Sequence, residues 1–307
     1  MIRWASRCAA AHRHTAVTLL ALLAAACRAE PGTDPGHDPP NTTQTADTEF
    51  LRFTDLGAGR GLLETAVVRY VGRSGAFIDL IGAVHIADRD YYRRLQARFG
   101  SYDALLYELV KPAGTPPPSA GADRAPRAGG VVSAFQRMLR NVLGLEFQLD
   151  AVDYRAPNFV HADLDTATFT RMSKDKGETL LGLMFELAKR QLAGSQRTDP
   201  GLGLGLLAAL FAPDREKRLK YLLARELPKL EGLLAGLGPR EGDGGSVLLI
   251  GRNRRLMEVL RARVRRGDRR IGVFFGAAHL PDVEQRIFSE IGFRRTSITW
   301  EKAWTIE

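Results

Sequence analysis

The stretch FIDLIGAVHIADRDYY, residues 77–92, has a close counterpart in RIGVFFGAAHLPDVEQ, residues 270–285. In both, an apolar run typical of a buried strand ends in Gly-Ala-x-His, which places His85 and His279 at equivalent positions. Ligands in open α/β sheets collect outside the carboxyl ends of strands, where glycine lets the backbone turn and approach a neighbour closely. Each histidine alone could be structural, but the repetition favours a shared function.

The similarity continues beyond the two motifs. After His85, an amphipathic helix over residues 87–99 and a strand over 102–110 lead to Glu108, twenty-three residues further on. After His279, a helix and a strand lead to Glu301, twenty-two residues further on. We therefore predict an α/β fold whose mixed β-sheet core is built from two related β-turn-α-β halves. The role of Glu301 stays open.

The rest of the chain supplies further strands and an insertion. Alternating or continuous apolar residues predict strands over 64–70, 76–81 and 246–251, and the spacing of 252–266 predicts a helix. Between the two halves, a mainly helical insertion is expected at about 131–237. It includes GLGLGLLAALFAP, which is too short to cross a bilayer and is interpreted as a packed helix or a segment that dips into a membrane.

The N-terminal 48 residues differ in composition from the rest. Residues 1–26 have the basic start, short apolar run and small-residue end of a secretory signal peptide. The ending LAAAC resembles a bacterial lipobox, with Ala24 where leucine is more usual, so Cys27 is predicted to carry a lipid; an ordinary signal-peptidase cut is the alternative. Residues 27–48, rich in Pro, Gly, Thr and Asp, then tether a domain over 49–307.

This processing limits the chemistry that is available. One of the two cysteines leaves with the signal peptide and the other is acylated, so no disulfide and no thiolate nucleophile remain. Loss of three arginines leaves 41 basic and 35 acidic residues, a net charge of +6 that suits an anionic membrane surface. The arginines of the 252–266 helix lack interleaved aromatics and indicate a solvated face, not a nucleic-acid site. We expect a membrane-anchored lipoprotein of the bacterial cell envelope.

Two further residues are candidates for the site. Glu108 interrupts the apolar run ALLYELV, where a charge is costly unless it is paired, coordinated or at the strand end. A pair with a surface arginine is the alternative. His161 lies two residues before Asp163 in NFVHADLD, which suits a ligand with its supporting carboxylate or a loop histidine beside a helix cap.

Motifs of several enzyme classes are absent from the sequence. The chain has no His-Glu-x-x-His zinc helix, no Gly-x-Ser-x-Gly elbow, no Walker loop and no Gly-x-Gly-x-x-Gly fingerprint. These absences argue against a serine or cysteine hydrolase of the usual kind and against a nucleotide-dependent enzyme.

Taken together, the two Gly-x-x-His motifs, the Tyr-Glu pair after the first, GRNRRLMEVL at 251–260 and QLDAVDYRAPNFVHADL at 148–164 resemble the TraB/PrgY/GumN family. This family is related to the Tiki proteins and more distantly to the ChaN-like and erythromycin-esterase-like proteins. The resemblance covers residues from about 62 to 305. It implies a two-half α/β core with a helical insertion and a site where both motif histidines meet.

The resemblance also implies roles for individual residues. Tiki members are metal-dependent peptidases, which assigns His85 and His279 to a divalent ion and makes Glu108 a ligand or general base. Arg252 and Asn253 match the Arg-Asn pair of the family, which binds substrate, orients the site or stabilises an oxyanion. With imidazole and carboxylate ligands, the ion is zinc, manganese, cobalt or iron. The leading prediction is therefore a metal-dependent hydrolase of a peptide or another small amide or ester.

Some features match the family less well and leave alternatives open. His161, a second candidate proton acceptor, is matched only in a bacterial branch, and Gly251 stands where many relatives have Glu. A C-terminal membrane anchor is not found, and the predicted lipid would take its place. Two other functions are compatible with the resemblance: a non-catalytic protein that binds or sequesters a peptide signal, and a haem- or iron-binding lipoprotein.

Overall fold

The computed structural model describes residues 48–118, 143–179, 182, 205, 208–209, 211–236 and 245–307. The predicted signal peptide, Cys27 and nearly all of the tether lie outside these residues, as does most of the glycine-rich apolar segment. No helix in the described part of the chain combines the length and the apolar character needed to span a membrane.

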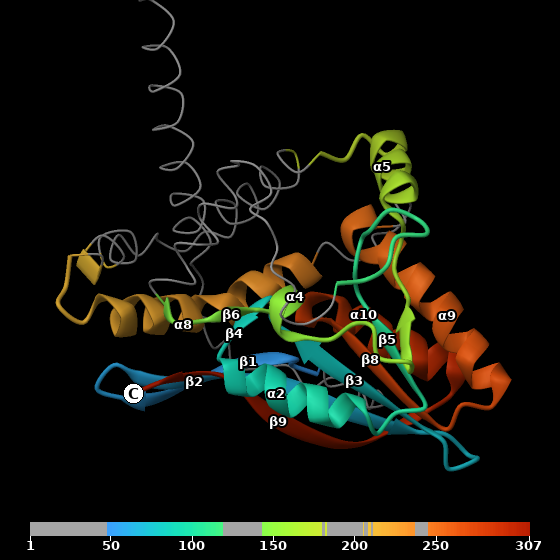
Figure 1. Cartoon of the computed structure of the whole chain (residues 1–307), viewed down its shortest axis with the longest axis horizontal. Helices are drawn as coiled ribbons and strands as arrows, with labels where there is room; N and C mark the ends of the chain where they lie inside the picture. Colours follow the sequence, from blue (N-terminus) through green and yellow to red (C-terminus); the bar gives the residue numbers. More distant parts are fainter. Residues whose placement is uncertain are drawn as a thin grey trace, which may run out of the picture.

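A twisted sheet forms the centre of the molecule (Figure 1). Its strands in the described residues are β1 (Leu51–Gly57), β2 (Arg60–Val71), β3 (Phe77–Ala83), β5 (Ala104–Tyr107), β7 (Phe159–His161), β8 (Arg270–Gly276) and β9 (Arg294–Ile306). β9 pairs along one side of β2, while β1 and β3 pair with successive parts of its other side, and β8, β5 and β7 continue the sheet beyond β3. The sheet is mixed, because β3, β8, β5 and β7 are parallel and the pairings of β2 are antiparallel. The predicted α/β class with a mixed sheet is confirmed.

The connections put helices on both faces of this sheet. α2 (Arg89–Phe99) links β3 to β5, whereas α10 (Leu280–Arg286) and a following turn, η3 (Ile287–Ile291), link β8 to β9. These crossovers run in opposite directions along the sheet, so right-handed connections require opposite faces. Adjacent residues of a strand point to opposite faces of the sheet, and Phe274 and Phe275 of β8 contact different helical segments. Phe274 packs on Phe99 of α2, while the ring of Phe275 lies 5.7 Å from that of His279, just before α10.

The two halves are interleaved. β8, from the second half, lies between β3 and β5 of the first half. This arrangement brings the two Gly-Ala-x-His motifs onto neighbouring strands. The two glutamates of the repeat, Glu108 and Glu301, have different surroundings. Glu301 pairs with Arg94 at 3.3 Å and with Arg98 at 2.9 Å, both on α2. Glu301, on β9, therefore holds α2 against the sheet by ion pairs.

The prediction of a strand at 246–251 is wrong. Residues Val247–Gly251 form a wide helical turn, η1, which continues directly into α9 (Arg252–Arg266). Ser246 caps the turn by accepting a hydrogen bond from Leu248 N–H, and the Glu178 carboxylate accepts one from Val247 N–H. A five-residue apolar run is compatible with either a buried strand or a buried helix, and these caps select the helix.

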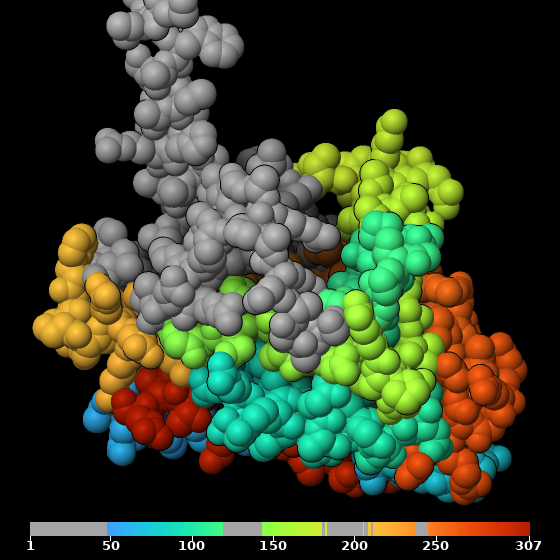
Figure 2. Space-filling view, viewed as in Figure 1, coloured from blue at the N-terminus to red at the C-terminus, as the bar shows by residue number. Residues whose placement is uncertain are grey.

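The predicted insertion is only partly helical in the residues described. It contains α4 (Gln148–Ala151), α5 (Thr166–Asp175) and α8 (Arg215–Ala235), but also β7 of the main sheet. A short strand, β6 (Glu146–Phe147), pairs with β4 (Ile86–Ala87) directly after the first motif. α5 has no buried residues and stands out from the body of the molecule beside α9 (Figure 2). The insertion is therefore attached to the core through β6, β7 and α8, which packs on β1, β2 and β9.

Candidate functional site

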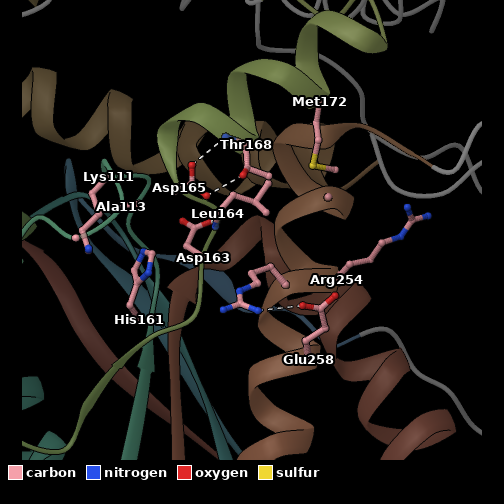
Figure 3. Close-up of a pocket in the computed structure, with 13 residues that line it drawn as sticks. Lys111, Ala113, His161, Asp163, Leu164, Asp165, Thr168, Met172, Arg254 and Glu258 are labelled. Atoms are coloured by element: carbon pink, nitrogen blue, oxygen red, sulfur yellow. Dashed lines mark hydrogen bonds and ion pairs between the residues drawn. The ribbon is translucent and has the colours of Figure 1, made fainter.

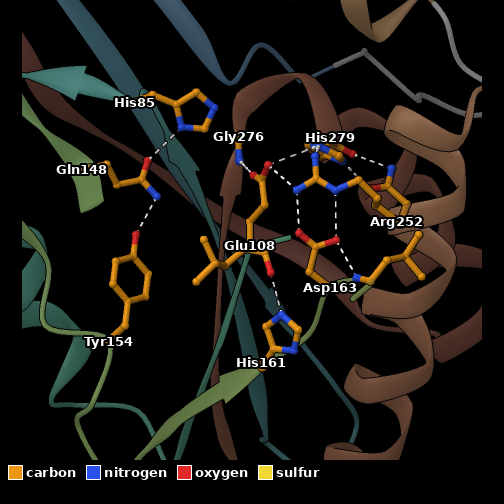
Figure 4. Close-up of polar contacts among 12 residues, drawn as sticks. His85, Glu108, Gln148, Tyr154, His161, Asp163, Arg252, Gly276 and His279 are labelled. Atoms are coloured by element: carbon orange, nitrogen blue, oxygen red, sulfur yellow. Dashed lines mark hydrogen bonds and ion pairs between the residues drawn. The ribbon is translucent and has the colours of Figure 1, made fainter. Parts of the chain in front are cut away.

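Four neighbouring parallel strands end beside one another, and each is followed by a polar residue of the site (Figure 4). His85 follows β3, His279 follows β8 in a short 3-10 turn, η2 (Ala277–His279), and Glu108 follows β5. Asp163 comes two residues after the end of β7. Because the carboxyl ends of parallel strands meet at one edge, the sheet topology collects these side chains.

The two motif glycines are required by close contacts. A Cβ atom on Gly82 would lie 3.0 Å from the Phe50 carbonyl oxygen, a backbone atom that cannot easily move aside. A Cβ atom on Gly276 would lie 3.3 Å from Oε2 of Glu108 and 3.7 Å from Cδ2 of His279. The second glycine therefore makes room for the carboxylate and the imidazole at the sheet edge.

Arg252, the first residue of α9, lies at the centre of the buried charges. Its Nε and Nη2 atoms donate to the two carboxylate oxygens of Asp163, at 2.9 and 2.5 Å. The same Nη2 donates to Oε1 of Glu108 at 2.6 Å, and Nη1 lies 3.4 Å from Nε2 of His279. Arg252 is only 7% exposed and Asp163 only 3%. One guanidinium therefore compensates two buried carboxylates and leaves a net charge of −1 on the three groups.

Glu108 is held in its ionised form. Its Oε2 accepts a hydrogen bond of 2.6 Å from the backbone N–H of Gly276. Burial acts to raise the pKa of Glu108, but the positive charge of Arg252 and this N–H outweigh burial, so the pKa of Glu108 lies well below its usual value. A carboxylate with such a low pKa is a stable negative charge and a weak proton acceptor.

His279 is held in its neutral form. Nδ2 of Asn253 donates to the backbone oxygen of His279 and to Oδ2 of Asp282, so Oδ1 of Asn253 is the acceptor for Nδ1–H of His279, at 2.7 Å. This tautomer leaves the lone pair on Nε2, which lies 3.7 Å from Oε1 of Glu108. Burial lowers the pKa of His279 to about 4, despite the opposing effect of Glu108. Imidazole at this position is uncharged at neutral pH.

His85 repeats this arrangement in a solvent-exposed setting. Its Nδ1 lies 3.3 Å from Oε1 of Gln148, and Nε2 of Gln148 donates to the hydroxyl of Tyr154 at 2.8 Å. We therefore assign the proton to Nδ1 and the lone pair to Nε2 of His85. Gln148 and Tyr154 are buried, whereas His85 is exposed. Tyr92 of α2 donates to the Val84 carbonyl and so holds the backbone before His85.

His161 points to a different part of the molecule. Its Nε2 lies 2.7 Å from the backbone oxygen of Leu109, and its ring packs on Tyr107. His161 lines a cavity of about 600 Å³ on the α5 side of the sheet edge, which it shares with Asp163 (Figure 3). The cavity is also lined by positively and negatively charged side chains: Lys111, Asp165, Arg254, Arg255 and Glu258. The carboxylate that shares the Arg252 guanidinium with Glu108 is therefore Asp163, and His161 faces the neighbouring cavity.

A third carboxyl group approaches the sheet edge from α8. Glu231 approaches the backbone N–H of Ala278, in the turn that carries His279. Its Oε2 is buried, and the described residues supply no hydrogen-bond partner for it, although the residue as a whole is partly exposed. Burial and the charge of Glu108 raise the pKa of Glu231 to about 7, against the effect of the Ala278 N–H.

The three predicted metal ligands do not fit a metal ion in this arrangement. Arg252 already donates to Glu108 and faces the Nε2 lone pair of His279, so a second cation would be repelled from both. In the part of the chain that the structure describes, no three His, Cys, Asp or Glu side chains lie so that they could hold a metal ion. Metal binding by His85, His279 and Glu108 stays a prediction.

Most of the residues expected from the sequence come together. Direct contacts join His279, Glu108, Arg252 and Asn253, and His85 lies at the same edge. Sequence reasoning missed three residues as members of the site: Asp163, Gln148 and Glu231. Only Asp163 carried a signal, because it lies two residues after His161, but the sequence analysis took it as support for that histidine and not as a partner of Arg252. Comparison with family models, with curated proteins and with solved structures gives no significant match.

Proposed function

We propose that the chain is a hydrolase of the TraB/GumN type that cleaves an amide or ester bond of a peptide or another small substrate outside the cytoplasm. His85 is the general base that takes a proton from the attacking water. The observation that carries this proposal is the orientation of His85, an exposed residue whose Nδ1 is held by Gln148, which in turn is bonded to Tyr154. A base oriented by a second group is the usual design for activating a nucleophile. Export and lipidation at Cys27 belong to the same proposal.

Glu108 stabilises the charge that forms on this base. Positive charge on His85 lowers the pKa of Glu108, so the two groups interact across the sheet edge. In the proposed reaction, the Glu108 carboxylate lies at the same sheet edge and offsets the positive charge that His85 gains from the attacking water. The low pKa of Glu108 keeps this negative charge in place throughout the reaction.

The Arg-Asn pair positions the site in this proposal. The guanidinium donors of Arg252 are directed at Glu108 and Asp163, which supports an orienting role over direct contact with substrate. Asn253, fully buried, fixes the neutral tautomer of His279. His279 then accepts weak donation from Arg252 and keeps the guanidinium in register with Glu108.

Replacement of His85 tests the reaction directly. We expect His85→Ala to lower kcat/KM by about 10²-fold or more, the usual contribution of a general base, against a fluorogenic peptide library and p-nitrophenyl esters. Since His85 is exposed, its removal is expected to change stability by less than about 0.5 kcal/mol. The matched control is His161→Ala, which replaces a histidine of the neighbouring cavity. Loss of activity in the control together with full activity in His85→Ala would refute the assignment.

Elemental analysis tests the metal that the resemblance implies. Because Arg252 opposes a second cation, we expect wild-type protein, loaded with zinc, manganese, cobalt or iron and then desalted, to retain less than one ion per chain. The double variant His85→Ala/His279→Ala is expected to retain the same amount. One ion per chain in the wild type, lost in the double variant, would instead support the metal-dependent hydrolase.

A peptide-binding protein without activity is the second candidate. The cavity beside Asp163 favours it, because its volume suits a short peptide and its lining offers both positive and negative side chains. In that case the wild type would bind a peptide without turnover, and His85→Ala would bind it with unchanged affinity. Turnover that depends on His85 would support the hydrolase and contradict a peptide-binding protein without activity.

A further inference from the structure

The end of the sheet opposite the candidate site carries a row of residues that begins and ends in arginine. At the start of β3 and β8, Arg270 lies opposite Phe77, and Phe77 lies opposite Val71 of β2. Arg294, the first residue of β9, lies opposite Val71 on the other side of β2. Because neighbouring strands lie about 4.8 Å apart, this row spans about 14 Å across the sheet.

The segments beside this row bring further arginines to the same end of the molecule (Figure 1). The turn that joins β2 to β3 contains Arg73, and Arg269 holds this turn to the start of β8 by donating to the backbone oxygen of Ser74 at 2.9 Å. α9 ends at Arg266, three residues before Arg269. We call the exposed arginines of these segments the basic end: Arg73, Arg265, Arg266, Arg269 and Arg294.

The acidic side chains near the basic end are already paired with other arginines. Three ion pairs account for them: Asp103 with Arg270, Asp268 with Arg263, and Glu290 with Arg261. The arginines of the basic end have no acidic partner within the described part of the chain. Exposed charges of one sign on one surface create a field that attracts an extended surface of opposite charge.

The chain enters the described domain beside the basic end. Thr48, the first described residue, donates to Oε1 of Glu284 at 2.7 Å and accepts a hydrogen bond from Arg295, the neighbour of Arg294. Cys27, which is predicted to carry a lipid, lies 21 residues before Thr48. A random coil of this length has an r.m.s. span of about 25 Å. A lipid at Cys27 would therefore keep the basic end within about this distance of a bilayer.

We propose that the basic end is a docking surface for the anionic headgroups of a lipid bilayer. A single acyl chain binds a membrane only marginally, and a basic surface next to the anchor supplies the second attraction. Nucleic acid is a poorer partner, because bases stack on exposed rings and Phe293, beside Arg294, is buried. The inference uses the predicted lipid at Cys27 but does not depend on the hydrolase reaction.

Docking through the basic end determines which way the candidate site faces. The basic end lies where the parallel strands begin, whereas His85 and His279 follow the carboxyl ends of these strands. β3 has seven residues, and with a rise of about 3.3 Å per residue it separates the two edges by about 20 Å. The site therefore faces away from the bilayer, where it is open to soluble substrates.

Binding to lipid vesicles tests the docking surface. The parent protein is the full chain with Cys27→Ser, which cannot be acylated, and residues 1–48 are the same in every form compared. Vesicles of phosphatidylcholine alone are compared with vesicles that also contain phosphatidylglycerol. The variant with four exposed arginines of the basic end replaced by glutamine keeps Arg269, because this residue holds the turn: Arg73→Gln, Arg265→Gln, Arg266→Gln and Arg294→Gln.

We expect this variant to bind the anionic vesicles about 10²-fold more weakly than the parent, because each arginine near an anionic surface contributes about fivefold. Its binding to phosphatidylcholine should be unchanged. The matched control removes the same charge from exposed residues elsewhere on the domain and should lose less than about threefold: Arg60→Gln, Arg171→Gln, Lys174→Gln and Arg215→Gln. Circular dichroism checks that both variants are folded.

Three results would overturn the inference. The parent could bind both kinds of vesicle equally, or the two variants could lose the same affinity for anionic vesicles. The basic-end variant could also lose affinity for duplex DNA while it keeps its affinity for vesicles, which would make nucleic acid the partner. Hydrolysis by this variant should equal that of the parent, so failure of the docking surface would leave the proposed function untouched.

Discussion

Replacing Arg252 with methionine will destabilise the fold by about 3–5 kcal/mol, the usual cost of removing one partner from a buried ion pair. The variant leaves Glu108 and Asp163 buried, close together and without their shared guanidinium. Urea unfolding followed by circular dichroism at pH 7 measures the loss as a lower midpoint with a similar slope. The deficit should shrink as the pH falls, because in the variant a proton on Glu108 reduces the unpaired buried charge.

Arg255→Met is the matched control for this prediction. Arg255 lies one turn further along α9, is exposed and pairs with Glu258 at 3.1 Å, so its loss should cost less than about 0.5 kcal/mol. Adding Glu108→Gln and Asp163→Asn to Arg252→Met should recover part of the stability, since neutral amides need no guanidinium. An Arg252→Met variant as stable as Arg255→Met would contradict the central place of this charge.

Replacing Glu231 with glutamine will stabilise the protein at alkaline pH. The pKa of this carboxyl rises from its usual 4.5 to about 7 in the folded state. Between these values the native state keeps the proton and the unfolded state releases it, so the contribution of Glu231 to stability falls as the pH rises. The gain in Glu231→Gln should be near zero at pH 4.5 and about 3 kcal/mol at pH 8. Unfolding curves at both pH values measure it.

Other ionisable groups in the site should not mask this effect. The lowered pKa of His279 makes the protein less stable as the pH falls from 6.5 towards 4, but this contribution is common to wild type and variant. Glu226→Gln, the control, should lose stability at pH 8 because Arg225 and Lys229 lose their partner. A gain in Glu231→Gln that did not change with pH would contradict the prediction.

Several elements were predictable because their periodicity is local. The apolar runs ending in Gly82 and Gly276 form buried strands, and the helical spacing of 252–266 forms α9. The run VLLIG at 247–251 was misassigned, since five apolar residues carry no usable period. β7 was missed for the same reason: three residues are too few to show alternation.

The candidate site was predictable to the extent that its residues follow strands. The sequence by itself determined that His85 and His279 each stand at the end of an apolar run and that Glu108 interrupts one, because such a pattern depends only on neighbouring residues. Tertiary structure alone decided that β8 lies between β3 and β5, which brings the two motifs to one edge. It also decided that Arg252 bridges Asp163 and Glu108, which are 89 and 144 residues away along the chain. A local pattern reports which side chains are buried, whereas the state of a buried charge depends on which other charges share its surroundings.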